Sequence, residues 1–163
     1  MESLPAAKSA SASRVTMTEL VIPEDTNPQG NIFGGRVMAL IDKAAAIVGM
    51  RHCRTQVATA SVDSLTFLSP IRLGSIVILE GRIHNVFRTS MEVGIRVESE
   101  DVLTGARRHT TTAFVTLVSI DSEGNPIPAP PLLLETEEDR LLAREASNRR
   151  AYRLLNRKGT PAS

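Results

Sequence analysis

A proline-free segment, residues 35–52, constrains the fold of this chain more than any other feature. It is rich in strong helix formers, and a helix built from it is apolar around most of its circumference. Its polar edge consists of Arg36, Lys43 and Arg51, which lie seven or eight positions apart. Such a helix needs cover on nearly all sides, so we expect the rest of the chain to wrap around it.

After position 54 the pattern changes from helical to β. Four runs rich in Val, Ile, Thr and Phe are separated by turn residues: 56–67, 75–86, 90–100 and 107–120. The connections between them are short, which indicates antiparallel pairing. With a further strand at residues 15–22, these runs predict an α+β architecture in which an antiparallel sheet curls around a long central helix.

The chain length of 163 residues predicts a single domain with flanking segments. We expect residues 1–13, rich in Ala and Ser, to form a disordered leader, and residues 14–125 to form the domain. Residues 126–163 begin with a proline-rich hinge and continue as a C-terminal helix. Thr136 is positioned to cap this helix, with Asp139 at the third helical position. We interpret it as a peripheral or oligomer-packing helix.

Composition argues against several kinds of partner. The net charge is +1, so the chain has no overall attraction to nucleic acid or to an anionic membrane, and we expect neither as a partner. No apolar run approaches the ~20 residues that a membrane span needs. Cys53 is the only cysteine, which rules out an intrachain disulfide. A lone thiol favours a reducing compartment, and we therefore predict a cytoplasmic location.

The common catalytic and metal-binding motifs are missing. The chain contains no GxSxG, Walker A, GxGxxG or HExxH pattern. His52, His84 and His109 do not have the spacing of metal ligands, and we expect no metal site. Cys53 follows His52 directly, but neighbouring side chains on a helix diverge, so we interpret Cys53 as a small buried residue and not as a nucleophile.

Asp42 is the first candidate for chemistry. It lies within the apolar helix, where an unpaired carboxylate costs several kcal/mol. Such a group either borders a catalytic cavity or is paired with a nearby arginine or with backbone amides. The residues around Asp42 do not decide between these two interpretations.

The second candidate is the segment that leads into the helix, residues 27–35. A helix N-terminus offers free backbone N–H groups and the positive end of the dipole, which can stabilise an oxyanion. Gly34 and Gly35 allow a ligand to approach the backbone closely. Asn27 or Asn31 could orient a water molecule or a carbonyl group.

These features occur together in a pattern that resembles a known family. The stretch VIPEDTNPQGNIFGGRVMALIDKAAAIVGMRHC resembles the signature region of hotdog-fold acyl-CoA hydrolases of the cytosolic long-chain, or brain acyl-CoA hydrolase, type. Its pattern is T-N-x-x-G-x-x-F-G-G followed by a helical Asp. The resemblance continues through TASVDSLTFLSPIRLGS and FRTSMEV, spanning residues 15–121, and the tail LETEEDRLLAREASNRR is similar to the C-terminal extension of that group.

The resemblance implies an acyl-CoA thioesterase that releases a free fatty acid and CoA. By position, Asp42 is its general base or nucleophile, and Asn27 holds the attacking water or the thioester. The helix N-terminus at Gly34 and Gly35 polarises the carbonyl. No metal or organic cofactor is implied, because a thiolate leaves readily.

The same resemblance implies a homo-oligomer. Asn27 of one protomer meets Asp42 of another, so the enzyme is at least a dimer, and a trimer of dimers (a hexamer) is common in the family. Arg88, Thr89 and Ser90 match a stretch that lies near bound CoA, although a solvated hairpin turn explains them equally well. We expect structural roles for Ser61 and Asp63 on the strand after the helix.

Two other functions compete with hydrolysis. A non-enzymatic acyl-CoA sensor could share the fold, but such sensors usually carry a DNA-binding segment, and none is visible here. A hotdog enoyl-CoA hydratase relies on an Asp with a His a few residues later, whereas Asp42 is followed by KAAAI.

Overall fold

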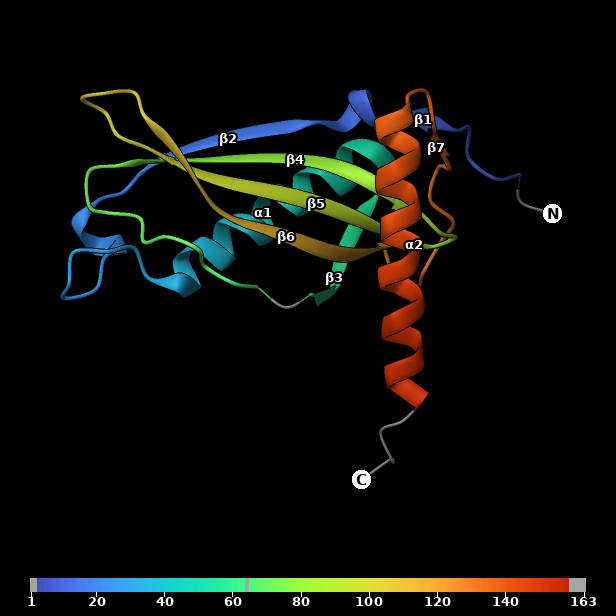
Figure 1. The fold of residues 1–163 in the computed structure, drawn as a ribbon. Helices are drawn as coiled ribbons and strands as arrows, with labels where there is room; N and C mark the ends of the chain where they lie inside the picture. Colours follow the sequence, from blue (N-terminus) through green and yellow to red (C-terminus); the bar gives the residue numbers. More distant parts are fainter. Residues whose placement is uncertain (1–2, 64, 159–163) are drawn as a thin grey trace.

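A computed structural model describes residues 3–63 and 65–158 of the protein. Its main element is a five-stranded antiparallel sheet with the strand order β2-β4-β5-β6-β3 (Figure 1). The strands are β2 (Val15–Leu20), β3 (Gln56–Val62), β4 (Ile76–Val86), β5 (Ser90–Glu100) and β6 (Arg107–Ile120). The predicted antiparallel sheet is confirmed, although the run at 56–67 ends as a strand at Val62.

Helix α1 (Gly34–Cys53) lies along the concave side of the sheet and confirms the predicted central helix. Its buried face includes Val37, Leu40, Ile41, Ala44, Ala45 and Val48. The opposite side is open, with Met38 49% and Met50 42% exposed. The expectation of burial on nearly all sides is therefore wrong within one chain, because the sheet curls around only one side of the helix.

The outer face of the sheet is covered by helix α2 (Glu137–Lys158), which crosses the strands (Figure 1). The predicted cap is present: Thr136 Oγ1 accepts the Asp139 N–H at 3.0 Å, and Asp139 Oδ2 accepts the Thr136 N–H at 3.1 Å. Ala143 and Ala146 are buried, and their small side chains let the helix approach the sheet closely. On the outer face of β5, Glu92 is buried beneath this helix and is bonded to its Arg149, whereas Gly94 is covered by the ring of His84.

The N-terminal segment differs from the predicted disordered leader. Strand β1 (Lys8–Ser9) pairs in parallel with β7 (Leu132–Leu133), and a 3-10 helix follows at Ala10–Ser13. Ala10 and Ser13 are buried, because side chains this small fit against the body of the protein. The expectation of disorder is therefore wrong for residues 8–13, while residues 1–2 lie outside the described part. A second 3-10 helix, Pro23–Asp25, lies between β2 and α1.

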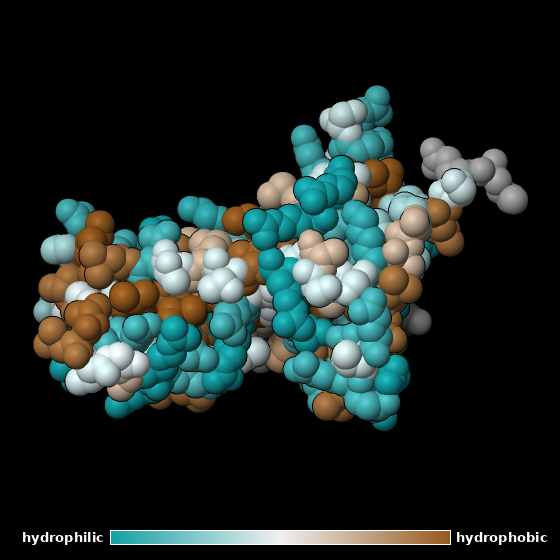
Figure 2. All heavy atoms as spheres, turned by 90° about the horizontal axis from the view of Figure 1, so that it is seen from above, coloured by the Kyte–Doolittle hydropathy of each residue, from teal (hydrophilic) through white to brown (hydrophobic). Residues whose placement is uncertain are grey.

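The surface has two different ends. Hydrophobic residues gather at the end of the sheet away from α2, whereas the surface around α2 is mainly hydrophilic (Figure 2). Exposed apolar residues of the β2, β4 and β5–β6 ends include Leu20, Leu73, Val102 and Leu103. Within residues 3–63 and 65–158, no helix has the length and apolar character needed to cross a membrane.

Candidate active site

Asp42 projects from the open side of α1 and contacts the edge strand of the sheet. Its Oδ1 accepts a 2.6 Å hydrogen bond from the hydroxyl of Thr59 on β3. Both residues are exposed in the single chain. Among the described residues, Asp42 Oδ2 has no hydrogen-bond partner, so one oxygen of the carboxylate is held and the other is free to accept a proton or to attack. Within the described residues, Asp42 is therefore paired neither with an arginine nor with backbone amides.

Thr59 was not among the candidates from sequence. It begins the family-like stretch TASVDSLTFLSPIRLGS, but a threonine within a β-rich run has no feature that marks it as functional. Its role becomes visible only when the edge strand is placed beside α1. In the part of the chain that the structure describes, strand β3 pairs only with β6, so Thr59 lies at the edge of the sheet.

Asn27 shapes the loop before α1. Its side-chain oxygen accepts the N–H groups of Gln29 and Asn31, each at 3.1 Å, and its own N–H bonds to the Asn31 carbonyl at 2.8 Å. The side-chain NH₂ group has no partner in the described part of the chain. Asn27 therefore presents a pre-oriented donor to a carbonyl or a water molecule, whereas Asn31 serves the loop through its backbone.

The loop is fastened to the first turn of the helix by Asp25. Its carboxylate accepts the Nε–H of Arg36 at 3.0 Å and the N–H of Ile22 at 3.2 Å. Its carbonyl accepts the N–H of Phe33 at 2.9 Å. Gly30, with φ +79°, makes the turn between these anchored points. These bonds fix the orientation of the Asn27 amide relative to the helix axis.

The N-terminus of α1 is uncapped. Phe33 occupies the cap position without a side-chain hydrogen bond, and the first turn carries no acidic residue. Within residues 3–63 and 65–158, no acceptor meets the N–H groups of Gly34 and Gly35. A Cβ at Gly35 would meet no atom within 4 Å, whereas one at Gly34 would press on the Phe67 ring at 3.3 Å. Gly35 thus borders open space, where an anionic oxygen could bind.

The single chain does not bring Asn27 and Asp42 together. Asn27 precedes the helix, and Asp42 lies about 12 Å farther along the axis, counted from Gly34 at 1.5 Å per residue. Strand β4 is about 35 Å long at 3.3 Å per residue. The loop before α1 pairs with Arg72 near the start of β4, whereas the 87–90 turn follows the other end of this strand. The proposed components of the site are therefore distributed over one protomer.

Arg88, Thr89 and Ser90 form the β4–β5 turn. The Phe87 N–H bonds to the Ser90 carbonyl at 2.8 Å, and the carbonyls of Arg88 and Thr89 accept backbone N–H groups of Ala129 and Ser119, both at 2.8 Å. The backbone of the turn is thereby rigid. The Arg88 side chain is exposed and reaches into solvent.

The buried cysteine and histidine do not add to the site. Cys53 Sγ lies 3.8 Å from the Met91 sulfur, and burial raises the pKa of its thiol. His52 is fully buried with Nε2 2.8 Å from the Pro130 carbonyl, and burial lowers the pKa of its ring. The interpretation of Cys53 as a buried structural residue is confirmed. The described residues contain no His, Cys, Asp and Glu cluster that could hold a metal ion.

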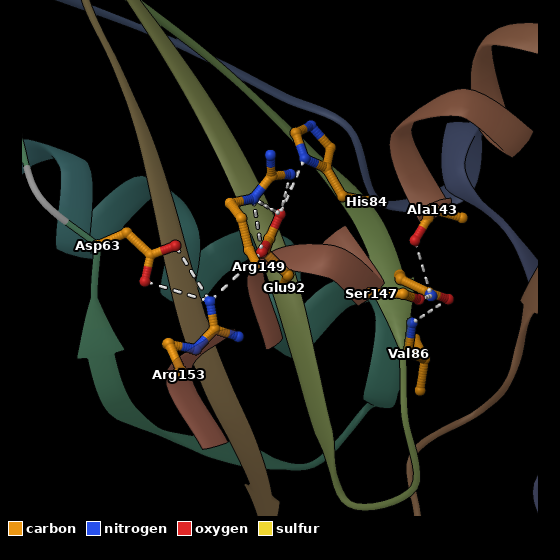
Figure 3. Close-up of polar contacts among 9 residues, drawn as sticks. Asp63, His84, Val86, Glu92, Ala143, Ser147, Arg149 and Arg153 are labelled. Carbon is orange, nitrogen blue, oxygen red and sulfur yellow. Dashed lines mark hydrogen bonds and ion pairs between the residues drawn. The ribbon is translucent and has the colours of Figure 1, made fainter. Parts of the chain in front are cut away.

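A buried ion network was also missed from sequence (Figure 3). Glu92, fully buried on the outer face of β5, accepts hydrogen bonds from Arg149 of α2 at 2.6 and 3.1 Å and lies 3.3 Å from His84 Nδ1. Burial alone would raise the pKa of Glu92, but its bonds to His84 and Arg149 outweigh this and hold the pKa below its ordinary value. The alternation of apolar and polar residues along β5 places Glu92 on the face of the strand that would be expected to contact solvent.

Comparison with known proteins shows similarity to thioesterases and acyl-CoA thioester hydrolases. Residues 29–106 match the sequence profile of the Thioesterase superfamily. The protein named uncharacterized acyl-CoA thioester hydrolase YkhA of Bacillus subtilis is 42% identical over 94% of this chain and 89% of YkhA. The chain spans 41% of the length of the rat cytosolic acyl coenzyme A thioester hydrolase, to which it is 34% identical.

Solved structures of acyl-CoA thioesterases and hydrolases are also similar to this chain in sequence and in fold. An apo-hexameric acyl-CoA thioesterase is 40% identical with a TM-score of 0.89, covering 97% of this chain and 100% of that chain. The Staphylococcus aureus acyl-CoA hydrolase in complex with butyryl-CoA, CoA and CoA disulfide is 34% identical with a TM-score of 0.86, covering 94% and 93%. Variants of that enzyme with an Asp, an Asn or a Thr changed to Ala have also been solved. This chain belongs to the thioesterase superfamily, and its curled sheet around α1 is the hotdog fold of the acyl-CoA hydrolases in that family.

Proposed function

We propose that the protein hydrolyses fatty acyl-CoA to a free fatty acid and CoA at a site that two protomers complete. The observation that carries this proposal is the Thr59–Asp42 contact, which leaves one carboxylate oxygen free on an open surface. The hydroxyl of Thr59 holds the carboxylate in one orientation, as a catalytic base or nucleophile requires. The similarity to acyl-CoA hydrolases along nearly the whole chain supports the same chemistry.

The need for a second protomer follows from the uncovered surface beside Asp42. Met38 and Met50 expose apolar area on the same side of α1, and β3 offers an unpaired strand edge. Pairing of two such edges by a two-fold axis would bury both features at once. In this arrangement Asn27 of the partner subunit approaches Asp42, which the long distance within one chain does not allow. The similar hexameric structure supports a trimer of such dimers.

The chemistry follows from the groups at the site. As a general base, Asp42 removes a proton from a water molecule while the oxygen of that water attacks the thioester carbonyl. As a nucleophile, Asp42 attacks the carbonyl itself, and water later hydrolyses the acyl anhydride that forms. The Asn27 NH₂ group orients the water or the carbonyl. The N–H groups of Gly34 and Gly35 stabilise the negative oxygen that forms. The C–S bond then breaks, and CoA leaves as a thiolate that takes up a proton, without a metal or organic cofactor.

The remaining assignments concern substrate and location. We assign Arg88, Thr89 and Ser90 to the CoA part of the substrate, because their turn is rigid and its arginine is exposed. We assign the protein to the cytoplasm, where the thiol of Cys53 stays reduced.

The test is steady-state hydrolysis of acyl-CoA esters from acetyl to palmitoyl, followed by release of free thiol. We expect turnover that saturates with substrate, at a chain length that the experiment identifies. Tight binding of acyl-CoA without thiol release would instead support the sensor. Hydration of an enoyl-CoA with the thioester left intact would support the hydratase.

A further inference from the structure

The carboxylate of Asp25, two residues before Asn27, joins two separate parts of the chain. Its Oδ2 accepts the N–H of Ile22 at 3.2 Å and so closes the 3-10 turn that leads into the Asn27 loop. Its Oδ1 accepts the Nε–H of Arg36, in the first turn of α1, at 3.0 Å. The Asp25 side chain is 15% exposed, so these bonds compete little with water. One carboxylate therefore connects the entry of the loop to the helix that follows the loop.

The backbone of Asp25 makes the same connection independently. Its carbonyl accepts the N–H of Phe33 at 2.9 Å, and its N–H bonds to the Ile22 carbonyl at 3.0 Å. A substitution at position 25 removes the carboxylate but leaves these backbone groups in the chain. The contribution of the side chain can thus be measured without removing every bond that holds the loop.

The orientation of the Asn27 amide depends on this connection in two steps. The amide oxygen accepts the N–H groups of Gln29 and Asn31, each at 3.1 Å, so the amide is fixed relative to the loop. The loop is held at its far end by a bridge between Asn31 and Arg72. At its near end it is held to α1 by Asp25. The angle between the Asn27 amide and the helix axis is therefore set by Asp25.

A purely structural anchor would explain the bonds of Asp25 but not what they hold. The pair with Arg36 lies near the surface, and such pairs add little to stability. The rigid loop carries an amide whose NH₂ group has no hydrogen-bond partner among the described residues. A polar group that is both open and rigidly mounted is preorganised for a ligand, which favours a role for the mounting in catalysis.

We propose that Asp25 is a positioning residue of the candidate active site. Its carboxylate does not touch the substrate or the attacking water, and it acts by holding the Asn27 amide at a fixed angle to α1 through the Arg36 guanidinium. A misplacement of about 1 Å can cost on the order of 10²-fold in rate, so loss of the carboxylate lowers turnover although Asn27 is still present. This inference rests on the proposed function and adds a residue to its machinery.

The first test is a double-mutant cycle in steady-state hydrolysis of acyl-CoA, with Asp25→Ala introduced into the wild type and into Asn27→Ala. In the wild type we expect kcat to fall about tenfold, while KM changes by less than about twofold. In the Asn27→Ala background we expect no further fall in kcat, because the amide that Asp25 positions is gone. The matched control is Glu24→Ala, which changes an exposed residue of the same 3-10 helix and should keep the wild-type kcat.

The second test is amide hydrogen exchange, which needs no turnover. The N–H groups of Gln29 and Asn31 report directly on the Asn27 side chain that accepts them. In Asp25→Ala we expect both to exchange at least about tenfold faster than in the wild type, while the N–H groups of β5 keep their protection.

The two tests separate this inference from the proposed function. A wild type that releases no thiol from any acyl-CoA contradicts the proposed function, and the exchange rates still test the link between Asp25 and Asn27. Unchanged exchange of Gln29 and Asn31 in Asp25→Ala overturns the inference. A fall in kcat of the same size in the wild type and in Asn27→Ala overturns it as well, because Asp25 would then act independently of Asn27.

Discussion

The hydroxyl of Thr59 lies 2.6 Å from Oδ1 of Asp42 and joins the edge strand β3 to the central helix α1. This bond determines which carboxylate oxygen remains free at the candidate site. Thr59→Val keeps the shape of the side chain but removes the donor. We expect kcat to fall about 10- to 100-fold, the scale of a hydrogen bond to a charged group. Thr59→Ser retains the hydroxyl and should restore most of the activity. Equal kcat for the Val and Ser variants would show that the bond does not matter.

Asp42→Asn tests the carboxylate itself. The amide is nearly isosteric and still accepts the Thr59 hydrogen bond, but it cannot take a proton or form an acyl anhydride. We expect kcat to fall on the order of 10²-fold or more. The melting temperature should change little, since Asp42 is exposed and its neighbours stay in place. A folded Asp42→Asn protein with wild-type turnover would contradict the assignment.

Mixing two inactive variants tests whether the site is shared. Asn27→Ala and Asp42→Ala subunits should each have little activity. After subunit exchange, a mixed dimer contains one intact site and one site that lacks both groups, so part of the activity should return. Exchange is checked by native mass spectrometry. Activity that stays at the level of the parents, with mixed dimers present, would place both residues in a site within one chain.

Arg88→Ala tests the β4–β5 turn. Loss of an exposed phosphate contact weakens ground state and transition state alike, so we expect KM for acyl-CoA to rise severalfold with kcat unchanged. The effect should shrink as salt rises, because screening weakens exposed charge contacts. Acyl-pantetheine, which lacks the nucleotide phosphates, should show little change. An equal penalty on both substrates would leave Arg88 as an ordinary turn residue.

Glu92→Gln tests the buried network under α2. The pKa of Glu92 is held below its ordinary value of 4.5 in the folded chain, so its ionised form stabilises the fold above that pH. We expect the free energy of unfolding of the variant to fall by about 2–3 kcal/mol at pH 7. This is less than the loss expected when a fully buried ion pair is broken, because Arg149 remains partly exposed. The difference from wild type should shrink as pH falls below 4.5 towards the lowered pKa of Glu92 in the folded chain, where protonation removes its charge in the wild type as well.

The control for this measurement is Glu98→Gln. Glu98 bonds to Arg96, whose side chain is 50% exposed, at 2.8 Å, and such surface pairs contribute little. Chemical denaturation at pH 7 and at pH 3.5 measures the free energy of unfolding of the wild type and of both variants. A Glu92→Gln loss that persists undiminished at the lower pH would mean that packing, and not the charge, is responsible.

Much of the fold and part of the site could be predicted from sequence, for local reasons. Helix α1 and strands β5 and β6 follow from periodicity and turn residues, which act over a few positions. Asp42 stood out as a candidate because a carboxylate in an apolar helix is unusual in its immediate surroundings, whereas Asn27 was preferred to Asn31 only through the resemblance to the family motif. The cap formed by Thr136 and Asp139 could also be predicted, because a capping box is a local pattern of residues at the start of a helix.

Other features depend on residues that are distant in the chain. Thr59 gains its role only because β3 is the edge strand, and Glu92 is buried only because α2 crosses the outer face. The order of Lys8–Ser9 depends on pairing with Leu132–Leu133. By itself, the sequence determined where helices and strands form and which groups are chemically out of place. The tertiary structure alone decided which of these groups meet and which side of α1 stays open, because contacts between distant segments leave no periodic pattern in the chain.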